Sequence, residues 1–346
     1  MGLGKKPYLR IAAEEGYCPP ELLQIYRDLI DNKKVEDPAF NTMFRFYLDS
    51  PSARVRQIND GLVSITGHRL QQMDEAGIDK AILSLTSPGV QVLEKEDAVS
   101  FARYSNDWLV DEMAKAPPGR FYGLAAIAPQ DPVEAANEIA RGKQLGLRGV
   151  IVNSHTKGEY LDDRKFWPIF EAAEAEDMPI YLHPQTPPPK MSAPFLERGL
   201  DGAIYGFAVE TGLHMLRIMT AGVFDRFPKL TMVIGHLGEA LPFWLYRLDY
   251  MHRAGVNSKR YESMQPTKRT ISQYMRENVY ITNSGVAWEP GIKFCQQVLG
   301  VDRVLYAMDY PYQYEPSEVA ALDAMDMPDE DKKKFFQTNA EKVFKL

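Results

Sequence analysis

The chain has 346 residues, of which 45% are apolar and 25% charged, and its formal net charge of −7 comes without a basic stripe. This composition is ordinary for a globular protein with a large core, and it argues against nucleic acid as a partner. The longest apolar stretches fall far short of the roughly 18 to 20 residues that cross a bilayer, and residues 1–6 lack an apolar signal core, so we predict a cytoplasmic protein that spans no membrane.

In its first half the chain alternates between strand-like apolar runs and amphipathic, helix-like segments. Residues 33–51 interrupt this alternation and are rich in aromatic side chains, which is typical of a segment that caps a site or packs as a flap. The other elements predicted up to residue 145 are, in chain order, a strand at 8–13, helices at 19–32 and 54–76, a strand at 80–86, a helix at 97–115, a strand at 121–128 and a helix from the N-cap Asp131 to Leu145.

The alternation continues to the C-terminus. The predicted elements are a strand at 147–153, a helix at 164–177, a strand at 179–183, a helix within 206–227, a strand at 230–236, helices at 241–252 and 267–277, a strand at 279–283, a helix at 289–299, a strand at 304–308 and C-terminal helix to Leu346. Eight short strands alternating with helices predict one α/β domain over residues 1–346, a (β/α)8 TIM barrel with an N-terminal insertion and C-terminal helices. A doubly wound open sheet is the alternative, although residues 12–16 contain no glycine-rich phosphate loop.

Four ionisable residues close predicted strands: Glu14, His183, His236 and Asp309. In a parallel barrel the carboxyl ends of the strands meet at one mouth, so we expect these side chains to lie close together. Carboxylates and imidazoles form an oxygen and nitrogen ligand set that suits a divalent ion such as Mn²⁺ or Zn²⁺. The two cysteines stand far apart in the chain, so neither a disulfide framework nor a thiolate metal site is expected.

Three of these residues stand in longer, distinctive segments. The segments read Tyr181-Leu182-His183-Pro184, Gly235-His236-Leu237-Gly238-Glu239 and Ala307-Met308-Asp309-Tyr310-Pro311. They resemble the decarboxylase branch of the amidohydrolase superfamily, which includes the resorcylate and aminocarboxymuconate semialdehyde decarboxylases. The resemblance covers nearly the whole chain and is closest to the carboxyvanillate decarboxylases, whose sequences match the stretches at 86–90, 153–156, 283–290 and 334–342.

This resemblance implies a single metal ion, Mn²⁺ or alternatively Zn²⁺, held by Glu14, His183 and Asp309. His236 would then lie beside the ion rather than on it. Superfamily members usually supply an HxH pair from the first strand, and resorcylate decarboxylases an ExH pair. Here Glu14 is followed by Glu15 and a glycine, so the histidine is absent, as in the carboxyvanillate enzymes. We expect Glu15 to point to the opposite face of the strand and to be structural.

The resemblance further implies the reaction. The protein would be a carbon–carbon lyase that removes CO2 from 5-carboxyvanillate without oxidation and releases vanillate, in the catabolism of lignin-derived aromatic compounds. Loss of CO2 from an aromatic ring requires an acid that delivers a proton to the carbon bearing the carboxyl group. Asp309 is the first candidate for this catalytic role, and His236 is the alternative.

The resemblance also implies substrate contacts. Arg54, Arg247, Tyr47 and Tyr312 match family positions that, together with His236, contact the substrate, a small aromatic carboxylic acid. In the related enzymes the arginine corresponding to Arg247 reaches the site of a neighbouring subunit. A homo-oligomer, either a dimer or a tetramer, is therefore expected.

Other interpretations stay open at the level of sequence. His155 closes the fourth predicted strand and is a further candidate for the pocket wall. The same barrel mouth suits a decarboxylase of another ortho-hydroxy aromatic acid, or a metal-dependent hydrolase of an ester, lactone or amide. A small-molecule binding pocket without catalysis is the remaining alternative.

Overall fold

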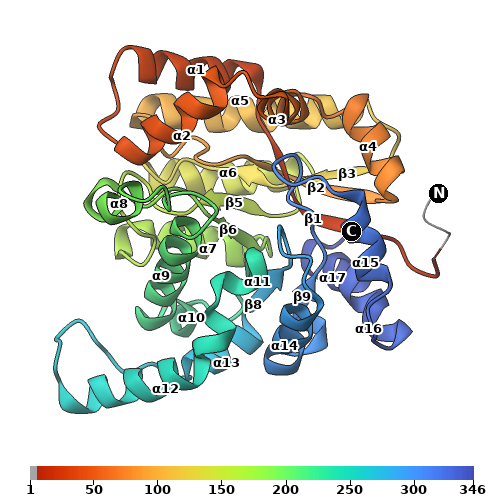
Figure 1. The fold of residues 1–346 in the computed structure, drawn as a ribbon. Helices are drawn as coiled ribbons and strands as arrows, with labels where there is room; N and C mark the ends of the chain where they lie inside the picture. The colour runs from red at the N-terminus through yellow and green to blue at the C-terminus, as the bar shows by residue number, and fades with distance from the viewer. Residues whose placement is uncertain (1–5) are drawn as a thin grey trace.

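Parallel strands lie at the centre of the molecule, and helices surround them (Figure 1). The structure, a computed structural model, describes residues 6–346. The prediction that residues 1–6 contain no signal core therefore falls, except for Lys6, outside the described residues. The strands are β1 (Ile11–Tyr17), β2 (Lys80–Leu85), β3 (Phe121–Gly123), β4 (Ala125–Ala126), β5 (Val150–Asn153), β6 (Ile180–His183), β7 (Met232–Ile234), β8 (Val279–Thr282) and β9 (Val304–Leu305).

The strands close into a barrel. Parallel pairing runs from β1 through β2 to β3, and from β4 in chain order to β9. The Leu124 amide, between β3 and β4, donates to the Leu83 carbonyl (2.8 Å) and joins the two runs, while the Ala13 amide donates to the Tyr306 carbonyl (3.0 Å) and joins β1 to the segment after β9. With β3 and β4 as halves of one interrupted strand, the described residues form eight parallel strands, and the predicted (β/α)8 barrel is confirmed.

Helices follow the strands and cover the outside of the barrel. In Figure 1, α1, α2, α3 and α5 lie together at the top, while α12 projects from the opposite side. The α-helices are α1 (Pro20–Asp31), α2 (Pro38–Asp49), α3 (Ala53–Val63), α4 (His68–Ala76), α5 (Lys95–Ala114), α6 (Pro132–Gln144), α7 (Trp167–Ala175), α8 (Pro189–Leu196), α9 (Gly206–Thr220), α10 (Val223–Arg226), α11 (His236–Glu239), α12 (Leu241–Ser258), α13 (Ile271–Glu277), α14 (Glu289–Leu299), α15 (Pro316–Asp323), α16 (Asp329–Lys333) and α17 (Asn339–Phe344).

A buried asparagine supports the interrupted third strand. Asn106, in α5, accepts a hydrogen bond from the Ala126 amide through Oδ1 (2.7 Å) and donates through Nδ2 to the Ala126 carbonyl (2.9 Å). The same Nδ2 donates to Glu138 Oε1 (2.7 Å). The prediction of one continuous strand at 121–128 is therefore wrong: the strand is interrupted at Leu124 and ends at Ala126, where a side chain supplies bonds that a neighbouring strand would otherwise provide.

Glu14 lies inside β1, and the prediction that it closes the strand is wrong. The strand continues to Tyr17, and all of its residues except Gly16 are buried. The pairing register between β1 and β2 shifts between Ala12 and Glu15, which marks a bulge. Bulges bend a strand and re-aim its side chains.

His236 and Asp309 stand on turns rather than on strands. β7 and β9 end at Ile234 and Leu305, so both predicted strands are too long. The two residues have positive φ angles of 50° and 75°. A left-handed backbone of this kind cannot continue a strand.

Left-handed glycines divide two of the predicted helices. The segment at 54–76 forms α3 and α4, separated at Gly67 (φ 69°), and the segment at 206–227 forms α9 and α10, separated at Gly222 (φ 78°). Glycine adopts this conformation without the clash of a Cβ atom. The C-terminal segment also differs from the single helix predicted, since it divides into α15, α16, a π turn and α17.

The aromatic-rich insertion contains a helix that the sequence pattern did not reveal. Asp37 caps α2 by accepting hydrogen bonds from the Ala39 and Phe40 amides (both 3.0 Å). Phe40 and Phe44 pack against the ring of Tyr26 in α1, with centroids 5.9 and 4.9 Å away. One face of α2 is therefore anchored to α1.

No helix among residues 6–346 combines the length and the apolar character needed to cross a membrane. A single domain over the whole chain and a cytoplasmic location both stay predictions.

Replacing Asn106 by alanine should lower the free energy of unfolding by about 2–4 kcal/mol, because the amide and carbonyl of Ala126 would be left buried without these partners. Scanning calorimetry or urea titration measures the change. Asn137→Ala, at an exposed position of α6, is the control and should change stability by less than about 0.5 kcal/mol. Equal stability of the two variants would contradict the role assigned to Asn106.

Candidate metal centre

Three side chains from distant parts of the sequence meet at one mouth of the barrel. Glu14 comes from β1, His183 from the end of β6 and Asp309 from the turn after β9. One potential ligand atom of each lies within 4.8 Å of the other two. The structure therefore brings together the three residues that the resemblance implies as ligands.

One carboxylate oxygen of Glu14 accepts two hydrogen bonds, and the other accepts none from the described residues. Its Oε2 accepts hydrogen bonds from the Tyr181 hydroxyl and from Thr282 Oγ1 (2.9 Å). Its Oε1 is buried, has no hydrogen-bond partner among the described residues, and lies 3.4 Å from His183 Nε2. A buried anionic oxygen without a donor is expensive unless a positive charge compensates it, so this oxygen fits a metal ligand.

His183 has the tautomer that a ligand needs. Its Nδ1 lies 2.8 Å from the Pro184 carbonyl, so this nitrogen carries the proton and Nε2 presents a lone pair toward Glu14. Burial lowers the pKa of His183 below its usual value, and the nearby Glu14 carboxylate only partly opposes the effect. The imidazole is therefore neutral.

Asp309 completes the cluster from a strained turn. Burial raises its pKa to about 7, although the nearby His236 acts in the opposite direction. A carboxyl group with such a pKa exchanges a proton near neutral pH. The group can therefore serve either as a ligand or as an acid.

His236 lies beside the cluster and is held by Glu239. Its Nδ1 donates to Glu239 Oε1 (2.7 Å), and its Nε2 lies 3.7 Å from Glu14 Oε1. Burial would lower the pKa of His236, but the Glu239 and Glu14 carboxylates outweigh burial and raise the pKa to about 10. Without a bound cation, His236 is thus the positive charge that faces Glu14.

An unusual backbone turn places this imidazole. Residues 236–240 all have positive φ, between 50° and 76°, and only Gly238 among them is a glycine. Each non-glycine residue in this conformation costs about 1–2 kcal/mol. Such strain concentrates at functional sites, where it fixes side-chain direction.

Two glycines leave room for the carboxylates. A Cβ atom on Gly235 would lie 2.7 Å from Glu14 Oε2, and one on Gly285 would lie 3.2 Å from Asp309 Oδ2. Both glycines therefore leave space for the carboxylates of two proposed ligands. The donor set and this space fit a divalent cation bound by oxygen and nitrogen.

A largely apolar pocket opens above the cluster. Tyr47 and Tyr312, two of the predicted substrate contacts, line it, and their rings meet edge to face with centroids 5.6 Å apart. The Tyr312 hydroxyl is 2.6 Å from Thr86 Oγ1. The pocket is lined by Met43, Phe44, Tyr47, Ser87, His183, Ala203, Phe207, His236, Asp309 and Tyr312.

The two predicted arginine contacts do not line this pocket. Arg54 is exposed on α3, where Nη2 donates to the Tyr312 carbonyl (3.1 Å), and it borders a neighbouring depression that also includes Gln57 and Glu318. Arg247 is exposed on the projecting helix α12 (Figure 1) and has no ion-pair partner within residues 6–346. Within one chain the structure leaves Arg247 outside the site.

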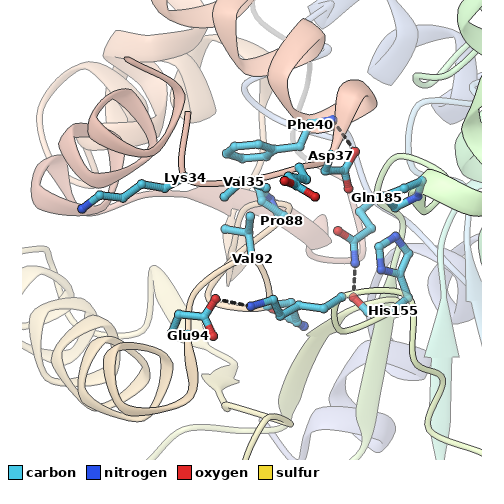
Figure 2. A pocket seen from close by; sticks show the side chains of 13 residues that line it. Lys34, Val35, Asp37, Phe40, Pro88, Val92, Glu94, His155 and Gln185 are labelled. Atoms are coloured by element: carbon cyan, nitrogen blue, oxygen red, sulfur yellow. Dashed lines mark hydrogen bonds and ion pairs between the residues drawn. The ribbon is translucent and has the colours of Figure 1, made fainter. Parts of the chain in front are cut away.

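His155 faces a different cavity, shown in Figure 2. Its Nε2 donates to the Thr186 carbonyl (3.0 Å), and its Nδ1 accepts from the Gly158 amide (3.1 Å). The cavity, about 330 Å³, is bordered by Lys34, Asp37, Phe40, Glu94, Lys157 and Gln185 among others. Both ring nitrogens are occupied, and His155, the further candidate for the pocket wall, does not line the metal pocket.

The sequence pattern missed the residues that hold the ligands. Tyr181 lies two positions before His183 on β6, so period-two alternation could have placed both on the interior face. Thr282 ends β8 in the same way. Glu239 follows His236 at a spacing of three, but its contact depends on the left-handed turn, which the sequence does not reveal.

The whole fold matches solved enzymes. The chain is similar to the structure of a 5-carboxyvanillate decarboxylase from Novosphingobium aromaticivorans with manganese and 4-hydroxy-3-methoxy-5-nitrobenzoic acid, with 54% identity, a TM-score of 0.97 and coverage of 100% of this chain and 98% of that chain. A 5-carboxyvanillate decarboxylase from Sphingomonas paucimobilis shows 37% identity, a TM-score of 0.91 and coverage of 98% and 99%.

Sequence comparison agrees with the structural match. The chain is 33% identical over 346 residues to a gamma-resorcylate decarboxylase of a Polaromonas species, with 97% of this chain and 98% of the relative covered. Residues 58–346 match the family described as Amidohydrolase. The chain therefore belongs to the amidohydrolase family, in the branch that contains the resorcylate and carboxyvanillate decarboxylases.

Proposed function

We propose that this protein is a metal-dependent, non-oxidative carboxy-lyase that converts 5-carboxyvanillate into vanillate and CO2. The observation that carries the proposal is the convergence of the free Glu14 oxygen, the unprotonated His183 Nε2 and the Asp309 carboxyl group beneath an aromatic-walled pocket. The similarity to manganese-containing 5-carboxyvanillate decarboxylases supports both the reaction and the substrate.

Glu14, His183 and Asp309 would hold one divalent ion, and Mn²⁺ is proposed because related structures contain it. When bound, the ion would supply positive charge for the carboxylate and the ortho phenolate oxygen of the substrate. Tyr181 and Thr282 would keep the Glu14 carboxylate in place, since both donate to its other oxygen. Burial, helped by Glu14, raises the pKa of Tyr181 well above its usual value, so the phenol remains a donor.

Asp309 would deliver the proton. Transfer of the proton to the ring carbon bearing the carboxyl group removes that carbon from the aromatic system, after which the C–C bond breaks and its electron pair restores the ring. His236, fixed by Glu239, would stay close to the reacting carboxylate and is the alternative donor. Proton transfer from a positioned acid contributes about 10²–10⁴-fold to such a rate.

The pocket would hold a planar ring. Phe207, Tyr47 and Tyr312 line its walls, and aromatic side chains bind a flat ring at little conformational cost. Arg54 donates to the backbone of Tyr312, a residue of the pocket wall, and would supply a guanidinium for the second carboxylate of the substrate.

We also propose that the protein is a homo-oligomer, a dimer or a tetramer, in which Arg247 reaches the site of a neighbouring subunit. α12 projects from the barrel (Figure 1) and exposes the aromatic side chains of Phe243 (72%), Trp244 (50%) and Tyr246 (86%). Large aromatic side chains are enriched in the buried parts of protein interfaces.

Reaction in D2O tests the reaction type. With Mn²⁺-loaded protein, 5-carboxyvanillate should yield CO2 and vanillate that carries one deuterium on the ring carbon that lost the carboxyl group. Mass spectrometry and NMR detect both products, and a panel of other ortho-hydroxy aromatic acids defines the substrate range. Release of a hydrolysis product, or binding of the acids without any turnover, would contradict the proposal and favour a hydrolase or a binding protein.

Substitution of the proposed ligands tests the site. Asp309→Asn should lower kcat by at least about 10²-fold, because it removes both a ligand and the proton donor, and His183→Ala should also reduce the amount of bound Mn²⁺. Product formation and metal content are measured on the same samples. Asp326→Asn, on a fully exposed side chain, is the control. Full activity of Asp309→Asn would refute the mechanism.

Mixed oligomers test the role of Arg247. Arg247→Met should lower kcat/KM by about 30-fold or more, the equivalent of ~2 kcal/mol, because a carboxylate would lose its charged partner. If Arg247 acts on a neighbour, subunits carrying Arg247→Met and subunits carrying Asp309→Asn should regain activity when they are unfolded and refolded together. Arg253→Met, also exposed on α12, is the control. Absence of complementation would show that Arg247 does not act between subunits.

A further inference from the structure

Glu15, the neighbour of Glu14 on β1, holds the backbone on both sides of Asp309. Its Oε1 accepts a hydrogen bond from the Met308 amide (2.9 Å), and its Oε2 accepts one from the Tyr310 amide (3.1 Å). The side chain is buried, with 2% of Glu15 exposed. Both oxygens are thus occupied by donors that flank a single residue, Asp309.

We infer that Glu15 is a positioning residue, which fixes Asp309 in the conformation that binds the metal ion. This inference rests on the proposed function, because it assigns to Glu15 a part in the same metal site. Glu14 would bind the ion directly, and Glu15 would act through the backbone of another ligand. Glu14 and Glu15, which are neighbours on β1, would therefore both contribute to the metal site, one directly and one through Asp309.

The backbone of Asp309 needs such support. Its φ of 75° lies in the left-handed region, which non-glycine residues rarely adopt. The two hydrogen bonds to the Glu15 carboxyl group join the amides before and after this left-handed residue. A further bond, from the Gly16 amide to the Tyr310 carbonyl (2.6 Å), ties the same turn to β1.

A buried arginine near Glu15 is also held in place by hydrogen bonds. Arg69 is buried, donates through Nη2 to the Gly16 and Gly61 carbonyls (2.6 and 2.8 Å), and places its guanidinium 4.5 Å from the centre of the Tyr310 ring. Arg69 therefore supplies positive charge near Glu15 and packs on the Tyr310 ring of the same turn. Motion of the turn would break contacts with both side chains.

Glu15 itself does not belong to the ligand set. Its carboxylate contacts amides on the segment after β9, whereas Glu14 contacts Tyr181 and Thr282 in the barrel interior. The bulge in β1 lies where these two side chains diverge. A direct metal contact would require Glu15 to abandon both amides.

The test compares Glu15→Gln with Glu138→Gln. Glutamine keeps one acceptor oxygen but directs an NH2 group at the second amide, so Mn²⁺ affinity, measured by the electron paramagnetic resonance signal of free Mn²⁺, should fall about 10- to 100-fold. Glu138 is equally enclosed, with 5% exposure, and binds Asn106 and Arg141 on α5 and α6. Glu138→Gln should therefore change thermal stability but leave Mn²⁺ affinity at the wild-type value.

Each outcome either supports or overturns the positioning role of Glu15. Wild-type Mn²⁺ affinity in folded Glu15→Gln, or an equal loss in both variants, would overturn the inference. If Glu15→Gln does not fold, Glu15→Asp, which keeps the carboxyl group but shortens the side chain, should show the same loss of affinity. Failure of both Glu15 variants to fold would assign Glu15 to the stability of the whole barrel and would also overturn it. Failure of the wild-type protein to bind Mn²⁺ would instead reject the proposed function.

Discussion

An ionised carboxylate inside a protein is stable only where donors and positive charge compensate its lost hydration. The arrangement of the whole site depends on how this requirement is met at Glu14. Tyr181 and Thr282 satisfy one oxygen, whereas the other faces His183 and His236 without a donor among the described residues. The arrangement favours a cation at the free oxygen. Burial keeps the His183 imidazole neutral although the Glu14 charge opposes this effect, whereas the Glu239 and Glu14 charges together keep the His236 imidazole positive.

Closure of the barrel is what makes this compensation feasible. Parallel strands deliver their carboxyl ends to one mouth, so residues from the start, middle and end of the chain can share a cation. The seam between β1 and the segment after β9 matters most, because it places Asp309 beside Glu14 and lets Glu15 bind the same turn. The contacts that close the barrel between β1 and the segment after β9 therefore also assemble the site.

The sequence predicts the number and order of the strands, because alternation of apolar runs and amphipathic helices has a clear period. It also predicts Glu14, His183 and Asp309 as a group, through their positions near strand ends and through family resemblance. It does not predict the bulge in β1, the left-handed turn at His236 or the bond from Asn106 to the third strand, since each depends on contacts between distant segments. Arg247 shows a further limit, because the contact proposed for it with a neighbouring subunit cannot be placed from one chain.

The run of left-handed residues after β7 has a consequence for engineering. Glycine at Ala240 would relieve local steric conflict, and such a change could raise the melting temperature of the barrel. The same relief would widen the range of directions open to the imidazole of His236. Efforts to make this enzyme more heat-resistant should therefore target other positions, because the backbone strain of this turn also fixes the direction of the His236 side chain.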